Sequence, residues 1–133
     1  MVGQLTASQL VALHEQVLAV SGGGMPGVRD MGRLEAAASR ISAGFGDVEF
    51  YPTPAEKAAA LLESIICDHP FVDGNKRTAM HAAATFLESC DIGLEYTTDE
   101  VIDFAVGVAT HDIDFDGIVA WLREHSEERE DEA

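Results

Sequence analysis

The chain has 133 residues, with 24 acidic against eight basic side chains and a formal net charge of −16 at pH 7. This length suits one domain that buries about two-thirds of its unfolded surface, so the fold requires no disulfide or metal staple. The negative charge argues against nonspecific binding of nucleic acid or of membrane surfaces. With no signal peptide and no apolar run near ~18 residues, the expected location is the cytoplasm.

Two helices are expected in the N-terminal part. Thr6 and Gln9 form a capping box, and apolar residues then recur at helical spacing as far as Val20. The glycines at 22–24 end this helix. A second helix is predicted from residue 30 to about residue 41, where apolar side chains again share one face.

The segment 43–52 (AGFGDVEFYP) interrupts the helical periodicity. Its two glycines are followed by apolar and aromatic residues, a pattern that favours a short β-hairpin exposed to solvent. We refer to this segment as the flap.

A pair of helices is expected after the flap. Thr53, followed by a proline and by Glu56, marks a helix start, and the apolar pattern continues to residue 67 or 68. An alanine-rich helix follows from residue 75 to about residue 90. Its small side chains would let neighbouring helices pack closely, as expected of a central helix.

The C-terminal part is expected to hold two more helices and a tail. Thr97 starts the first, and Asp116 is expected to cap the second, at 117–125. Residues 126–133 form an acidic segment, expected to be disordered. The predicted fold is therefore an all-α bundle of one domain, residues 1–125, around a central helix, with one short β-hairpin.

The segment 69–79 (HPFVDGNKRTA) concentrates chemically active groups at the start of the central helix. A helix that begins at Gly74 or Asn75 presents unpaired N–H groups and the positive end of its dipole, which together bind phosphate. Gly74 allows close approach of a ligand, and Asn75 adds an amide. Lys76 offers a mobile point charge and Arg77 a planar fork for two phosphate oxygens.

Two further residues in this segment suit catalysis. Asp73 could hold a Mg²⁺ that bridges phosphate oxygens, and His69 is the natural general base. Each group alone also has a commonplace reading: a turn and cap at Asp73, a satisfied loop histidine at 69, and solvated cations at Lys76 and Arg77. Their coincidence favours a phosphate site. A Walker loop is excluded, because its first glycine is missing.

The same residues resemble the signature of the Fic/Doc family, HxFxxGN(G/K)R, and are closest to its death-on-curing (Doc) branch. The segment 27–37 resembles the part of that branch that precedes the flap. The resemblance spans roughly residues 5–125 and implies a compact Fic/Doc-type helical bundle.

The resemblance also implies roles for individual residues. His69 would deprotonate a target hydroxyl, Asp73 would ligate Mg²⁺ on the nucleotide, and Arg77 would join His69 in catalysis. Residues 74–77 would hold the phosphates. The flap would pair with an extended segment of a target protein; its expected docking residues are Phe45, Gly46, Val48, Phe50 and Tyr51.

Two departures from AMP-transferring Fic enzymes indicate the reaction. Those enzymes carry glycine where Lys76 stands, and usually a second arginine where Met80 stands. In both positions this sequence resembles the Doc branch. Members of that branch transfer the γ-phosphate of ATP to a threonine of translation elongation factor Tu. The chain is thus expected to be a toxin-like protein kinase that uses ATP and Mg²⁺ and blocks translation.

Regulation and the alternative functions follow from the same resemblance. No (S/T)xxxE(G/N) inhibitory motif occurs in the chain, so the expected regulator is an antitoxin whose disordered segment folds into a groove. An AMP- or other nucleotidyl-transferring Fic enzyme and a non-catalytic interaction module remain open. The acid excess fits a solvated surface in a salt-rich cytoplasm better than an acidic recognition face, but both remain open.

Overall fold

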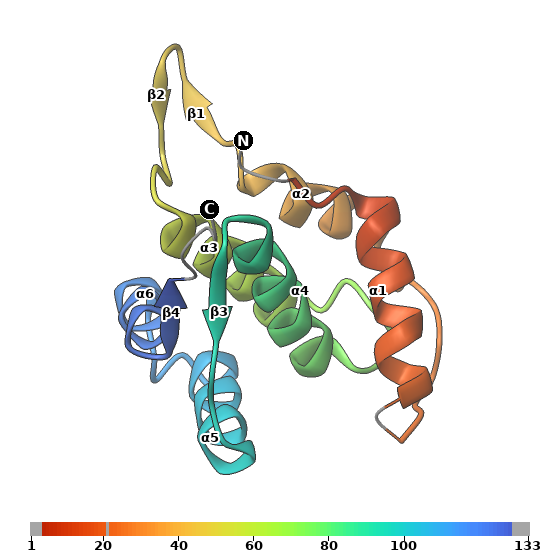
Figure 1. The fold of residues 1–133 in the computed structure, drawn as a ribbon. Helices are drawn as coiled ribbons and strands as arrows, with labels where there is room; N and C mark the ends of the chain where they lie inside the picture. Colours follow the sequence, from red (N-terminus) through yellow and green to blue (C-terminus); the bar gives the residue numbers. More distant parts are fainter. Residues whose placement is uncertain (1–3, 21, 129–133) are drawn as a thin grey trace, which may run out of the picture.

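Helices dominate the architecture, as the sequence predicts. The computed structural model describes residues 4–20 and 22–128. Its helices are α1 (Ala7–Val20), α2 (Met31–Arg40), α3 (Pro54–Asp68), α4 (Asn75–Ser89), α5 (Thr98–Ala109) and α6 (Phe115–Glu124) (Figure 1). Its strands are β1 (Gly44–Phe45), β2 (Val48–Glu49), β3 (Ile92–Leu94) and β4 (Ser126–Glu128). None of these helices is long and apolar enough to cross a membrane.

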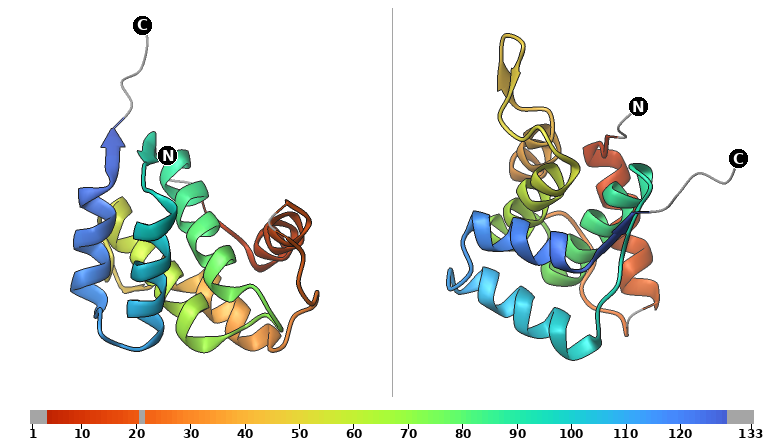
Figure 2. Two further views of the ribbon diagram at one scale, coloured as in Figure 1. Left: turned by 90° about the horizontal axis from the view of Figure 1, so that it is seen from below. Right: turned by 60° about the vertical axis from the view of Figure 1, so that its left-hand side comes forward.

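The core lies between α3 and α4, which make the most extensive contact in the fold. Leu62 and Ile65 on α3 are fully buried, as are Ala79 and Ala83 on α4. The alanines leave little side chain between the two helices, so their backbones approach closely. Because α4 also packs against α1 and β3, the prediction of a central helix is confirmed (Figure 2).

Side-chain caps begin five of the helices, α1, α2, α3, α5 and α6, near the predicted positions. Thr53 and Thr97 cap α3 and α5, and each accepts a hydrogen bond from the backbone of the glutamate three residues later. The prediction for α6 is wrong by two residues, because Asp114 accepts a 2.9 Å bond from the Gly117 N–H and the helix begins at Phe115. Asp116 lies inside the first turn.

A second small sheet was not predicted. Strand β4 pairs antiparallel with β3, with Ile92 opposite Glu128 and Leu94 opposite Ser126. The acidic segment expected to be disordered from residue 126 therefore begins as a strand. Strand pairing uses main-chain groups, which the composition of a segment does not report. The chain leaves α6 beside β3, and β4 is the strand with which β3 pairs. The rest of that segment, 129–133, lies outside the described residues.

The flap forms the predicted hairpin. Strands β1 and β2 pair with Gly44 opposite Glu49 and Phe45 opposite Val48. The two strands approach each other closely at Gly44, where a Cβ would lie 2.4 Å from the Val48 carbonyl oxygen. The hairpin projects away from the helices (Figures 1 and 2). Its apolar side chains are therefore exposed.

Candidate active site

The candidate site is built on the short loop 69–74 between α3 and α4, which we call the motif loop. His69 ends α3 in the left-handed conformation, with φ 49° and ψ 58°, and Gly74 precedes α4 with φ 74°. Glycine adopts this conformation freely, but a histidine does so at a cost and needs support from its surroundings. The two flanking helices belong to the core, so the ends of the loop are held in place.

Two arginines support His69: Arg29, just before α2, and Arg33, in its first turn. The Arg29 side chain donates from Nε to the His69 carbonyl at 2.6 Å and from Nη2 to the Asp68 carbonyl at 2.8 Å. Arg33 adds a 2.8 Å bond from Nη1 to the Asp68 carbonyl. These cations satisfy the last carbonyls of α3 and complement the negative end of its dipole. The backbone at 68–69 is thereby fixed, and His69 lines a cavity.

The backbone of the motif loop is also paired with segment 27–30. Val28 and Phe71 form an antiparallel bridge, and hydrogen bonds of 2.7–3.1 Å join the main chains of the two segments on either side of it. The start of the segment that resembles the Doc branch in sequence therefore holds the motif loop in place through main-chain hydrogen bonds.

Phe71 anchors the motif loop in the core. Its ring is fully buried and stacks on the buried imidazole of His14 from α1, with centroids 4.0 Å apart. The Asn75 side chain bonds the Phe71 backbone twice: Oδ1 accepts from its N–H and Nδ2 donates to its carbonyl, each at 3.0 Å. The Asn75 amide thus holds the motif loop against the start of α4, and its role in holding phosphate stays a prediction.

The Asp73 carboxylate is oriented by two backbone groups. Oδ2 accepts from the Met25 N–H at 3.1 Å, and Oδ1 accepts from the Gly74 N–H at 2.8 Å. The Met25 and Gly74 N–H groups, with a smaller contribution from the charge of Arg77, lower the pKa of Asp73. The carboxylate is therefore charged at neutral pH and exposed to solvent.

Asp73 fits the metal role that the sequence suggests. Mg²⁺ is usually bound by one or two carboxylates together with substrate phosphates and water. Among the described residues, no group of three or more His, Cys, Asp or Glu could enclose an ion by protein ligands alone. A single oriented carboxylate beside a candidate phosphate site is compatible with such a shared ion.

Residues 22–24, which we call the glycine loop, lie against Asp73 and Arg77. Arg77 donates from Nη1 to the Gly23 carbonyl at 3.1 Å. A Cβ on Gly24, whose φ is 141°, would lie 2.9 Å from Oδ2 of Asp73 and 3.1 Å from Nη2 of Arg77. Only glycine permits so close an approach at this φ. Arg77 is thus held near Asp73 by the glycine loop.

The leading end of α4 opens toward a cavity of about 830 Å³. Gly74 provides no side-chain cap there, which leaves the first amides of α4 without a capping side chain. One wall of the cavity is polar and comes from the motif loop and α4; it includes His69, Asp73, Gly74, Asn75, Lys76 and Arg77. The rest of the lining is mainly apolar and forms what we call the apolar wall, from α4, α5 and the segment before α5; it includes Met80, Tyr96, Val101, Ile102, Ala105 and Val106.

The structure thus brings the predicted residues of the motif together, but not the flap. Within the described part of the chain, none of the predicted docking residues of the flap lines this cavity. Sequence reasoning did not assign His14, Gly24, Met25, Arg29 or Arg33 to the site. The glycine run and the arginines at 29 and 33 were visible in the sequence, but their partners lie 35 to 54 residues away.

Comparison with known proteins shows the family of the chain. A model of the Fic/DOC family matches residues 4–87, a range that includes the whole motif loop. The protein named Toxin Doc of Mycolicibacterium smegmatis is 45% identical over 102 residues, 75% of this chain and 78% of that protein. Protein kinase doc of Escherichia phage P1 is 33% identical over 119 residues, 90% of this chain and 92% of that protein. From its family match and these two relatives, the chain is a member of the Fic/DOC family.

Proposed function

We propose that this chain is a toxin-like protein kinase that transfers the γ-phosphate of ATP to a threonine hydroxyl of a target protein. The observation that carries the proposal is the polar wall of the cavity. A histidine, an oriented carboxylate, two cations and an uncapped helix start all border one space there. The protein-kinase relative from phage P1, which aligns over 90% of the chain, supports the choice of reaction.

In the proposed reaction, His69 accepts the proton of the threonine hydroxyl as its oxygen attacks the γ-phosphorus. The bond from that phosphorus to the bridging oxygen breaks, and ADP leaves with the electron pair. Lys76, Arg77 and the first amides of α4 stabilise the charge that develops on the phosphates. Mg²⁺ held by Asp73 would neutralise part of this charge.

The apolar wall suits the nucleoside part of ATP. Ile102 on α5 is 54% exposed and Tyr96 is 36% exposed, so both have apolar surface available at the cavity. A cavity of about 830 Å³ lies within the usual range for small-molecule sites, about 300–1,000 Å³. Triphosphate at the cationic end and base at the apolar end would match both walls.

The proposed target is translation elongation factor Tu, and the proposed regulator is an antitoxin whose disordered segment folds into a groove of this protein. Both rest on the likeness to the Doc branch, and the relative named Toxin Doc supports the toxin role. The departures at Lys76 and Met80 favour phosphate transfer over AMP transfer.

Labelled ATP tests the reaction directly. The purified protein would be incubated with the elongation factor, Mg²⁺ and ATP labelled at either the α or the γ phosphorus. We expect label in the target only from γ-labelled ATP, and none with His69→Ala. Label only from the α position would show nucleotidyl transfer instead. If wild type and His69→Ala proved equally toxic on expression, the protein would act as a binding module.

A further inference from the structure

The flap has too little structure of its own to hold a fixed direction. Each of its strands has two residues, and isolated two-stranded hairpins are marginal in water. Phe45 is 83% exposed, Val48 66% and Phe50 57%. The direction of the flap must therefore be set where it joins the helices.

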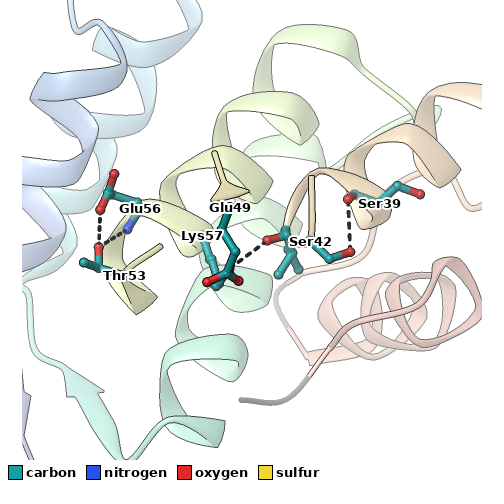
Figure 3. A network of polar contacts seen from close by, with 7 residues as sticks. Ser39, Ser42, Glu49, Thr53, Glu56 and Lys57 are labelled. Carbon is teal, nitrogen blue, oxygen red and sulfur yellow. Dashed lines mark hydrogen bonds and ion pairs between the residues drawn. The ribbon is translucent and has the colours of Figure 1, made fainter. Parts of the chain in front are cut away.

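At that junction lies Lys57, a buried lysine on α3. Its residue surface is only 5% exposed, and its Nζ donates to the Ile41 carbonyl at 3.2 Å and to Oε1 of Glu49 at 2.7 Å (Figure 3). A lysine this buried requires a partner for its charge. Glu49, on strand β2, supplies it, so the buried cation ties the returning strand of the flap to the end of α2.

A second contact between the flap and the helices involves Tyr51, two residues after Glu49. Arg40 donates from Nε to the Tyr51 hydroxyl at 3.0 Å, and its Nη2 pairs with Glu63 on α3 at 2.9 Å. These side-chain bonds hold Glu49 and Tyr51 to the helices, whereas Val48 and Phe50 are exposed, at 66% and 57%.

We propose that Lys57 is a positioning residue for the protein substrate: through Glu49 it fixes which face of the flap, the one with Val48 and Phe50, is presented to the target segment. This inference rests on the proposed function, since it assumes that a target docks on the flap. Lys57 does not line the active-site cavity, so its effect belongs to target binding and not to nucleotide binding.

Steady-state kinetics separate these effects. We expect Lys57→Met to raise KM for the protein target about tenfold or more, because misplaced docking groups lose binding. KM for ATP and kcat at saturating target should stay at wild-type values. Lys57→Arg should restore most of the loss, and Glu49→Gln should reproduce it from the exposed side of the pair. Glu35→Gln, which removes the same charge from the exposed surface of α2, is the matched control.

An unchanged KM for the target in Lys57→Met and Glu49→Gln would overturn the inference, as would equal losses in ATP binding. If Lys57→Met fails to fold, Glu49→Gln alone decides. If the wild type transfers no phosphate, the proposed function fails, and hydrogen exchange still tests Lys57. The Phe50 N–H, which bonds the Ala43 carbonyl at 3.0 Å, should exchange faster in Glu49→Gln than in Glu35→Gln, and the amides of α4 should not. No difference there would also overturn the positioning role.

Discussion

His14 and Asp73, 59 positions apart in the chain, are joined by a hydrogen bond of 2.7 Å from the imidazole Nε2 to the main-chain carbonyl. His14 is 1% exposed and also stacks on Phe71. Helix α1 therefore fixes the backbone of the residue whose carboxylate is proposed to hold the metal.

Replacing His14 with phenylalanine should keep the stacked ring and remove the hydrogen bond. We expect a loss of about 1–2 kcal/mol in the free energy of unfolding, because the Asp73 carbonyl loses its partner. The Mg²⁺ concentration for half-maximal phosphate transfer should rise. Urea denaturation and a Mg²⁺ titration measure the two effects. A stable His14→Phe protein with unchanged Mg²⁺ dependence would contradict this role.

Arg29 should matter for catalysis more than for stability. Its fork bonds the carbonyls of Asp68 and His69 at the protein surface. Arg29→Ala should cost less than about 1.5 kcal/mol of stability, whereas kcat should fall about tenfold or more as His69 loses its fixed position. Arg29→Lys should rescue little, since an ammonium group cannot reproduce the fork. Full activity in Arg29→Lys would show that only the charge is needed.

Asn75 should tolerate no change in its amide. Asn75→Ala removes both bonds to the Phe71 backbone and should destabilise the fold by about 1–3 kcal/mol. Asn75→Asp keeps an acceptor for the Phe71 N–H but sets a carboxylate oxygen against the Phe71 carbonyl. We therefore expect Asn75→Asp to lose stability as well, measured by urea denaturation. If it lost ATP binding alone, with wild-type stability, the amide would serve the phosphates and not the motif loop.

The apolar wall of the cavity can be tested with two ligands. Ile102→Asp places a charge where the nucleoside is proposed to lie. We expect it to weaken ATP binding about tenfold or more and to leave binding of inorganic triphosphate unchanged, as measured by calorimetry. Asp103→Asn, at an exposed neighbouring position on α5, is the control. Equal weakening for both ligands would place the nucleoside elsewhere.

The Glu100–His125 pair should make stability depend on pH. The Thr97 N–H and then His125 lower the pKa of Glu100 to about 2. Burial acts to lower the pKa of His125, but bonds with Glu100 and the Trp121 carbonyl outweigh it and raise the value. The Glu100 contribution is thus lost as the pH falls toward about 2, and the His125 contribution is lost as the pH rises through its raised pKa.

The pair should therefore contribute fully only between about pH 4.5 and about pH 6.5. Thermal melting of wild type and of Glu100→Gln, which keeps an acceptor for the Thr97 N–H, measures this. The difference in Tm should be larger at about pH 5.5 than at about pH 8.5. A difference that is independent of pH would mean that the ion pair does not contribute.

Local patterns accounted for much of the fold. The caps at Thr6, Thr53 and Thr97 and the glycines before the second helix are short-range signals, so the positions of the helices could be predicted. The cap of α6 was misassigned because Asp114 and Asp116 are equally good candidates in sequence. Strands β3 and β4 were missed because their pairing joins residues more than 30 positions apart, for which no local signal exists.

The sequence by itself determined the class of the protein and the chemistry of its motif, because those depend on residue types a few positions apart. Only the tertiary structure decided what each group does. It set the Asn75 amide on the motif loop, Arg29 and Arg33 on the carbonyls of Asp68 and His69, and the buried Lys57 on the flap. These contacts follow from how α1, α2 and α3 pack around α4, and packing depends on all helices at once, not on any one segment.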